Sequence, residues 1–151
     1  MASYWSLFPD FDHDETAPIQ EEFVRLSQQQ NWDGKDKMKA SARQKEWGKC
    51  FRSEFSQHYG QDASSLSGWQ SLCNEVGLDP IPQSVEACKM ALKGKVWVNI
   101  VDLVDCRRTG TKVKCHETRG HLRHYTKFNK KIFPKVEAKK NGFLTALLIT
   151  L

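Results

Sequence analysis

The sequence lacks a long apolar run: no stretch approaches the roughly 18–20 residues that a membrane-spanning helix needs. Its amino terminus, MASYWSLFPDFDHDE, has neither a basic region nor a continuous apolar segment, so we expect no secretory signal. The five cysteines are odd in number and form no C-x-x-C pair. These absences favour reduced thiols in an intracellular protein, cytoplasmic or nuclear, with no membrane partner.

Signatures of catalysis are also absent. The chain contains no Gly-x-Gly-x-x-Gly, Walker loop, Gly-x-Ser-x-Gly or His-Glu-x-x-His pattern. The acidic run DFDHDE (residues 10–15) lacks the glycine and distal glutamate of a calcium loop. The cysteines and histidines of residues 106–124 do not close a four-ligand zinc site. We therefore assign no metal, no cofactor and no catalytic residues.

The apolar spacing predicts a mainly all-α fold, a compact bundle of six or seven helices. Residues 1–14 are expected to form an irregular arm of aromatic and acidic residues, and 15–151 a single helical domain. Thr16 is a candidate cap for the first helix, Ser64 or Ser65 for the third and Ser84 for the fourth, and a later helix is expected to start near Thr118. The expected helices cover roughly residues 16–30, 36–59, 66–76, 84–94, 96–106, 118–128 and 135–151. Gly77 is expected to end the third of them, and the helix over 118–128 to carry Leu122, Tyr125 and Phe128 inward.

The stretch VWVNIVDLVDCRRTG (residues 96–110) decides the fold class. As a strand it places a polar residue on each face, whereas at 100° per residue its apolar side chains except Val98 share one arc, opposite Asn99, Asp102 and Asp105. We therefore predict a largely buried helix for Val96–Cys106. The alternative is a strand pairing with TKVKCHE across RRTG, which gives at most one short β-hairpin near residues 96–116.

Two carboxylates in this stretch, Asp102 and Asp105, stand three residues apart on one helical face. Such a pair can serve proton transfer or bind a metal. A solvated polar stripe, or pairing with Arg107 and Arg108, is the more common use of this spacing. An enzyme of unknown type that uses these carboxylates or a Cys–His pair is therefore our third hypothesis.

Charge is distributed unevenly along the chain. Residues 1–80 hold 8 Lys+Arg and 13 Asp+Glu, whereas residues 81–151 hold 15 and 5. Such a field attracts an acidic partner or a polyanion. The candidate partner- or phosphate-binding residues are Arg107, Arg108, Lys112, Lys114, Arg119, Arg123, Lys127, Lys130 and Lys131.

The leading hypothesis is a non-catalytic interaction or regulatory module. Its basic surface (residues 107–140) binds an acidic protein partner or mediates self-association, and Trp5 and Phe8 of the arm are candidate interface anchors. The second hypothesis is nucleic-acid binding, in which the same cations contact phosphates. No sequence signature of a known nucleic-acid-binding module favours this second hypothesis.

Two segments carry a resemblance: GWQSLCNEVGLDPIPQSVEACKMALKGKVWVNIVDLVDCRRTG, followed by HYTKFNKKIFPKVEAKKNGFLTALL. Together with HDETAPIQEEFVRLSQQQNW near the start, they resemble a group of small, uncharacterised intracellular proteins of filamentous ascomycete fungi. The resemblance covers about residues 8–149. It implies a fungal, intracellular setting and no mechanism.

Overall fold

The computed structural model describes residues 3–32, 37–131 and 141–147. The elements are, in chain order, η1 (Tyr4–Leu7), α1 (Ile19–Gln29), α2 (Lys37–Tyr59), α3 (Leu66–Glu75), α4 (Val85–Lys95), α5 (Ile100–Thr109), α6 (Arg119–Phe128) and α8 (Gly142–Leu147). The described residues form no strand, and their single β-bridge pairs Trp97 with His116. The predicted all-α class is thus confirmed.

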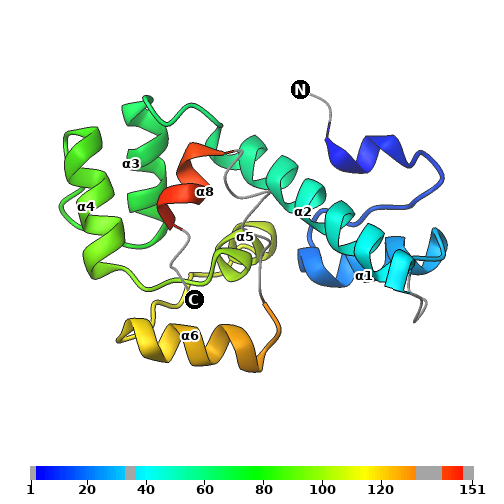
Figure 1. The fold of residues 1–151 in the computed structure, drawn as a ribbon. Helices are drawn as coiled ribbons and strands as arrows, with labels where there is room; N and C mark the ends of the chain where they lie inside the picture. Colours follow the sequence, from blue (N-terminus) through cyan, green and yellow to red (C-terminus); the bar gives the residue numbers. More distant parts are fainter. Residues whose placement is uncertain (1–2, 33–36, 132–140, 148–151) are drawn as a thin grey trace.

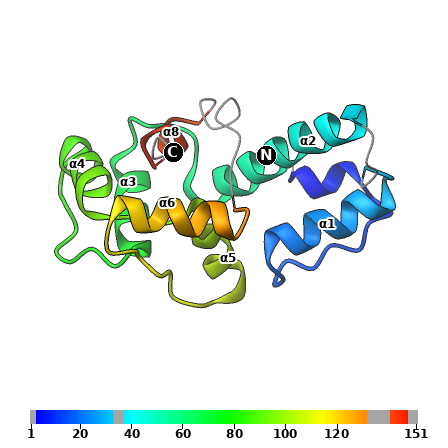
Figure 2. The ribbon, with the colours of Figure 1, turned by 60° about the horizontal axis from the view of Figure 1, so that its bottom comes forward.

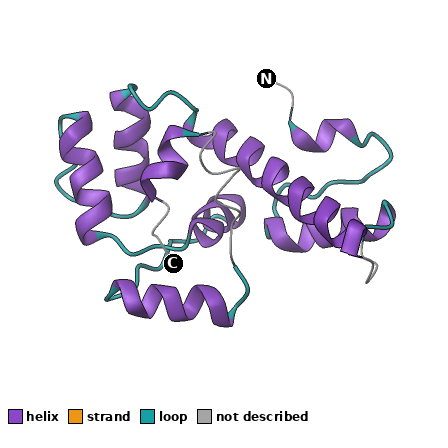
Figure 3. Ribbon diagram, viewed as in Figure 1, coloured by secondary structure: helices purple, strands orange, loops and turns teal. Residues whose placement is uncertain are grey.

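The long helix α2 connects the two ends of the molecule (Figure 1). Helices η1 and α1 pack against it at one end, while α3, α4 and α8 gather at the other. Helix α5 lies beside the middle of the fold and contacts α1. Helix α6 lies at the periphery, where a second view shows it crossing in front of the other elements (Figure 2). All regular structure drawn is helical (Figure 3).

The core is built on an aromatic stripe along α2. Trp47, Phe51, Phe55 and Tyr59 recur every four residues and are all buried, as the spacing predicts. Adjacent rings of the stripe pack at centroid distances of 4.8–6.4 Å. Each buried aromatic side chain contributes about 2–3 kcal/mol of transfer free energy. The stripe therefore provides the apolar surface of α2 against which neighbouring elements pack.

Two predicted caps, Ser65 and Ser84, are confirmed, and Thr118 caps α6 in the same way. The hydroxyls of Ser65, Ser84 and Thr118 each accept a hydrogen bond from the backbone N–H three residues later, at the start of α3, α4 and α6. The prediction for α1 was wrong, because α1 begins at Ile19 and not beside Thr16. A carboxylate from elsewhere, Asp105 of α5, accepts the Ile19 N–H at 2.7 Å.

The predicted helix over Val96–Cys106 begins four residues late. Val96 and Asn99 have extended backbones, and α5 starts at Ile100. Asn99 sets this boundary, because its Oδ1 accepts the N–H groups of Val101 and Asp102 at 2.9 and 3.1 Å. The alternative hairpin across Gly110 was also wrong: Gly110 (φ +75°) ends α5, and only the single Trp97–His116 bridge remains of the pairing.

Asn99 is buried and does more than cap α5. Its Nδ2 donates to Thr126 Oγ1 at 3.0 Å and to the Lys131 carbonyl at 3.2 Å. We expect Asn99→Ala to lower the free energy of unfolding by about 2 kcal/mol, since a cap and two buried partners are lost together. Thr118→Ala, which removes an exposed cap alone, is the control at about 1 kcal/mol. Urea unfolding measures both, and equal losses would contradict the added role.

The carboxyl-terminal part is described less completely. The expected helix over residues 135–151 includes residues 135–140 and 148–151, which lie outside the described residues. Within the described part, Phe143 and Leu144 of α8 are fully buried. Asn141 Oδ1 accepts the N–H groups of both. Helix α8 therefore packs into the core through Phe143 and Leu144.

Candidate functional site

The predicted basic surface divides into exposed and occupied cations. Arg108 was wrongly placed on it, and Lys131 is only partly exposed. The Arg108 side chain is 2% exposed, and Lys131 is bound to the Asp102 carboxylate. Arg107 is half-exposed, lies 3.7 Å from a Glu75 oxygen and stacks over the Tyr59 ring. The remaining candidates are all exposed: Lys112, Lys114, Arg119, Arg123, Lys127 and Lys130.

Helix α6 carries the most regular part of this surface. Arg119, Arg123 and Lys127 are four residues apart, so they form one row along the exposed side of the helix. His124 and Phe128 form a second row beside it, with ring centroids 6.0 Å apart and planes 20° from parallel. We call these five residues, together with Lys130, the α6 face.

Phe128 was expected to point inward, and this prediction was wrong. It is 77% exposed, whereas Leu122 and Thr126 bury the opposite side of α6. The spacing of Leu122, Tyr125 and Phe128 predicts one continuous apolar side of the helix, but the side chains become more exposed from Leu122 through Tyr125 to Phe128. Tyr125 turns its hydroxyl to Asp102 Oδ2 at 2.6 Å. Phe128 is therefore a large apolar group among cations at the surface.

A groove adjoins the carboxyl end of the α6 face. It encloses about 820 Å³ between α1 and α2, with Phe23, Val24 and Trp47 among its apolar lining. Lys130 and Asn129, the residues that follow α6, also line it. Val24 is 53% exposed there. The basic surface thus continues into a partly apolar depression.

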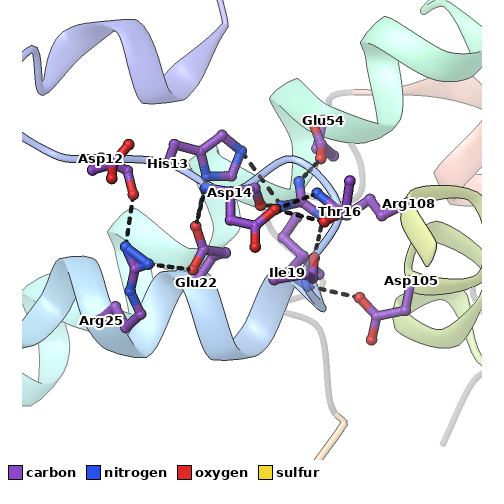
Figure 4. A network of polar contacts seen from close by, with 11 residues as sticks. Asp12, His13, Asp14, Thr16, Ile19, Glu22, Arg25, Glu54, Asp105 and Arg108 are labelled. Atoms are coloured by element: carbon purple, nitrogen blue, oxygen red, sulfur yellow. Dashed lines mark hydrogen bonds and ion pairs between the residues drawn. The ribbon is translucent and has the colours of Figure 1, made fainter.

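A second group of polar residues, missed by the sequence analysis, is buried around Arg108 (Figure 4). Arg108 Nε donates to the Ala17 carbonyl at 2.6 Å, and Nη2 donates to the Asp14 carbonyl at 2.8 Å. Nη1 forms an ion pair with Glu54, which is also buried. The guanidinium therefore joins α5, α2 and the segment before α1. We call residues 3–17 the N-terminal segment.

His13 lies between Arg108 and a buried carboxylate, Glu22 of α1 (Figure 4). His13 Nδ1 is 3.1 Å from Glu22 Oε1, and Nε2 is 3.4 Å from Arg108 Nη2. Because a guanidinium only donates, Nε2 is the acceptor and Nδ1 carries the proton. The imidazole also stacks on Trp5 with centroids 4.0 Å apart. Neutral His13 thus satisfies both polar neighbours.

Arg25 of α1 holds the same segment from another side. Its Nη2 donates to the Asp12 carbonyl at 2.6 Å, and Nη1 lies 3.1 Å from Glu22 Oε2. Its guanidinium stacks over the Phe11 ring at 5.0 Å. Glu22 Oε1 also accepts the Asp14 N–H at 2.6 Å. Arg25 and Arg108 are therefore each paired with a buried carboxylate, Glu22 and Glu54 respectively.

Burial sets the pKa values around Arg108. Burial, and then the charge of Arg108, lowers the pKa of His13, and Glu22 opposes this without reversing the direction. Burial also lowers the pKa of His58, whose Nε2 lies 3.9 Å from Glu54 Oε1 and has no hydrogen-bond partner among the described residues. Burial raises the pKa of the Cys50 thiol well above its usual value. Neutral imidazoles and a neutral thiol therefore surround one buried ion pair.

The two carboxylates of α5 have separate tasks. Asp102 accepts from Tyr125 and Lys131, whereas Asp105 caps α1. Burial raises the pKa of Asp105, partly offset by the Ile19 N–H. Burial, and then Asp102, raises the pKa of the Tyr125 phenol, which therefore resists acting as a base. Asp102 thus links α5 to α6 and Asp105 links α5 to α1, so the two carboxylates bind different partners.

Metal-ligating and nucleophilic side chains give no site in the described part of the chain. No group of three His, Cys, Asp or Glu residues there is placed to hold a metal ion. His116 and His121 approach each other through Nδ1 at 3.0 Å without a third ligand. Cys115 is exposed, but burial of its thiol raises its pKa, which opposes thiolate formation.

The aromatic residues of the N-terminal segment pack inward. Trp5, a predicted interface anchor, is 7% exposed and packs against Phe11 and His13, so its ring is occupied within the chain. Phe8, the other candidate, is half-buried against Tyr4 and Trp32. Leu7 is the exposed apolar residue of η1, at 68%. Trp5 is therefore an anchor of this segment on its own chain.

Compared with protein-family models, with curated proteins and with solved structures, the chain shows no match. In the described residues, none of the helices combines the length and apolar character needed to cross a bilayer. The resemblance to fungal proteins stays a prediction. The function must therefore be argued from the geometry of the α6 face and the Arg108 network.

Proposed function

We propose that this protein is a non-catalytic interaction module that binds an acidic protein segment through the α6 face. The observation that carries the proposal is the exposure of Phe128 beside a row of cations. Aromatic residues and arginines supply most of the binding energy at protein interfaces, and a polar rim surrounds them. Phe128 is the anchor in this arrangement, and Arg123 and Lys127 form the rim.

Three cations of this face, Arg123, Lys127 and Lys130, are available to a partner. Within the part of the chain that the structure describes, Arg123, Lys127 and Lys130 make no ion pair with a carboxylate. By contrast, Arg107, Arg108 and Lys131 are each paired internally. A carboxylate-rich segment is electrostatically complementary to the unpaired cations, and the net positive field of the second half of the chain attracts it.

The double variant Arg123→Glu/Lys127→Glu is expected to weaken binding of an acidic peptide by at least about tenfold, because two attractions become repulsions. The probe is a fluorescein-labelled peptide rich in glutamate with one central leucine, and the readout is fluorescence anisotropy. Phe128→Ala is expected to weaken the same binding by about 1–2 kcal/mol.

The matched control reverses two exposed charges elsewhere. Lys45→Glu/Lys93→Glu changes the net charge equally but lies on α2 and α4. If this control weakens binding as much as the α6 variant, the effect is one of net charge alone and the proposed site is wrong. Absence of peptide binding by the unaltered protein at low salt would contradict the proposal itself.

Nucleic-acid binding is the second candidate. It is favoured by the regular row of Arg119, Arg123 and Lys127, which repeats about every 6 Å along the helix. Titration of mixed-sequence DNA and RNA under the same conditions separates the candidates. Phosphate contact predicts a steep loss of affinity with salt, whereas an interface anchored by Phe128 retains affinity at near-physiological salt.

We place the protein inside the cell, in the cytoplasm or the nucleus, as part of this proposal. A second copy of this chain is one acidic partner that the α6 face could bind. The exposed acids Asp10, Asp12 and Glu15 near the amino terminus supply the charge that such a copy needs. Sedimentation velocity at low and near-physiological salt tests self-association. A monomer under both conditions leaves a different protein as the partner.

A further inference from the structure

The N-terminal segment is held on the body almost entirely by side chains of other elements. On α2, Ser53 Oγ accepts the Tyr4 N–H at 3.2 Å, and Glu46 accepts the Tyr4 hydroxyl at 2.7 Å. On α5, Arg108 holds the carbonyls of Asp14 and Ala17. Residues 3–17 contain no regular element besides the single turn η1. The segment is therefore held by side-chain contacts and buried rings and not by backbone pairing with another element.

These contacts meet at His13, which faces charged groups from every element packed on it. Glu22 and Arg25 face it from α1, and Arg108 faces it from α5 (Figure 4). Beyond Arg108, Glu54 and His58 lie on α2. Trp5, Phe11 and Asp14 are its neighbours within the N-terminal segment. Arg108 contacts the N-terminal segment through one titratable side chain of that segment, His13. Its protonation state therefore bears directly on docking.

A second proton on His13 enters at Nε2, because Nδ1 already carries one. Nε2 is the atom that faces Arg108 Nη2 at 3.4 Å, so two donors and two positive charges then oppose each other. The imidazole cannot turn away freely, because Trp5 covers one of its faces at 4.0 Å. The counter-charge of Glu22 is already shared with Arg25 and with the Asp14 N–H. Protonation thus conflicts with the docked arrangement.

We propose that the N-terminal segment is a proton-released strap, which neutral His13 keeps docked across α2 and which protonation of His13 releases. This inference goes beyond the proposed function and uses no residue of the α6 face. Release exposes the buried rings of Tyr4, Trp5 and Phe11, together with the part of α2 that they cover. The strap therefore controls access to an apolar face that is closed at neutral pH.

Docking of the N-terminal segment is expected to weaken as the pH falls. The pKa of His13 is lower in the docked state than its usual value, so the released state binds a proton more readily. Docking is unaffected above about pH 6.5 and weakens as the pH falls below that value. With one proton and an unperturbed pKa of about 6.5, release at about pH 5 is favoured by at most about 30-fold.

Hydrogen exchange of the whole chain, corrected for intrinsic rates, tests the strap at about pH 7.5 and about pH 5. We expect the N–H groups of Phe8, Phe11 and Asp14 to lose about tenfold in protection at the lower pH, while those within α3 and α4 retain it. In His13→Gln this dependence on pH is expected to disappear, whatever the protection of the segment. His124→Gln on exposed α6 is the matched control and is expected to behave like the unaltered protein.

Three outcomes would overturn the strap. Unchanged protection of the segment at both pH values shows that protonation does not release it. Loss of protection in α3 and α4 together with the segment shows global acid unfolding instead. If His58→Gln removes the pH dependence and His13→Gln does not, the titrating group is His58 and the inference is wrong.

Discussion

Replacing Arg108 with methionine is expected to lower the free energy of unfolding by about 3–5 kcal/mol. The substitution leaves Glu54 as a buried charge without its partner, since that residue is only 7% exposed. It also removes the donors to the Asp14 and Ala17 carbonyls. Methionine keeps much of the apolar stem, so the loss reports on the guanidinium. Urea denaturation followed by far-UV circular dichroism measures the change.

The preceding residue supplies the control. Arg107 also forms an ion pair, with Glu75, but its side chain is 42% exposed and the nearest atoms are 3.7 Å apart. Arg107→Met is therefore expected to cost less than about 1 kcal/mol. Adding Glu54→Leu to Arg108→Met is expected to restore part of the stability, because it removes the stranded charge. Similar losses for both arginines would show that Arg108 is not the buried partner described above.

Trp69→Ala is expected to cost about 3–5 kcal/mol, because it opens a cavity where α3 meets α8. Trp69 is fully buried, and its ring meets Phe143 at a centroid distance of 4.8 Å and an angle of 69°. The indole N–H also donates to the Ala63 carbonyl at 2.7 Å. Gly68 contributes to this packing, since a Cβ there would lie 2.6 Å from Phe143 Cζ. Thermal or urea unfolding measures the loss.

Phe128→Ala is the control for this second prediction. It also removes a large aromatic ring, but one that is 77% exposed, so its effect on stability is expected to stay within about 0.5 kcal/mol. The same variant weakens peptide binding if the proposed function is correct. A large stability loss for Phe128→Ala would mean that the ring packs within the chain and is not an anchor for a partner.

The features that were predicted correctly are local ones. The stripe of Trp47, Phe51 and Phe55 follows from the 3.6-residue period, and the caps at Ser65 and Ser84 involve residues three apart. Gly77 (φ +82°) ends α3 as predicted, with the Leu78 N–H bonded to the Cys73 carbonyl. Each depends on neighbours within about one or two turns, which the sequence displays directly.

The errors at the ends of elements have a tertiary cause. The start of α1 is capped by Asp105, which is 86 residues away from Ile19. Asn99 was placed on the polar side of a helix, but its bonds to Thr126 and Lys131 hold it as the boundary of α5. Periodicity cannot identify such partners, because they share no repeat with the residue they bind.

The sequence by itself determined the helical class, most helix boundaries and an exposed row of cations, because periodicity, capping and charge are properties of neighbouring residues. Only the tertiary structure decided which cations remain available. Arg107 and Arg108 are chemically identical neighbours, yet one is half-exposed and the other is buried by Glu54 and the backbone of residues 14 and 17. Consecutive residues of a helix point about 100° apart, and the elements that meet each direction come from distant parts of the chain.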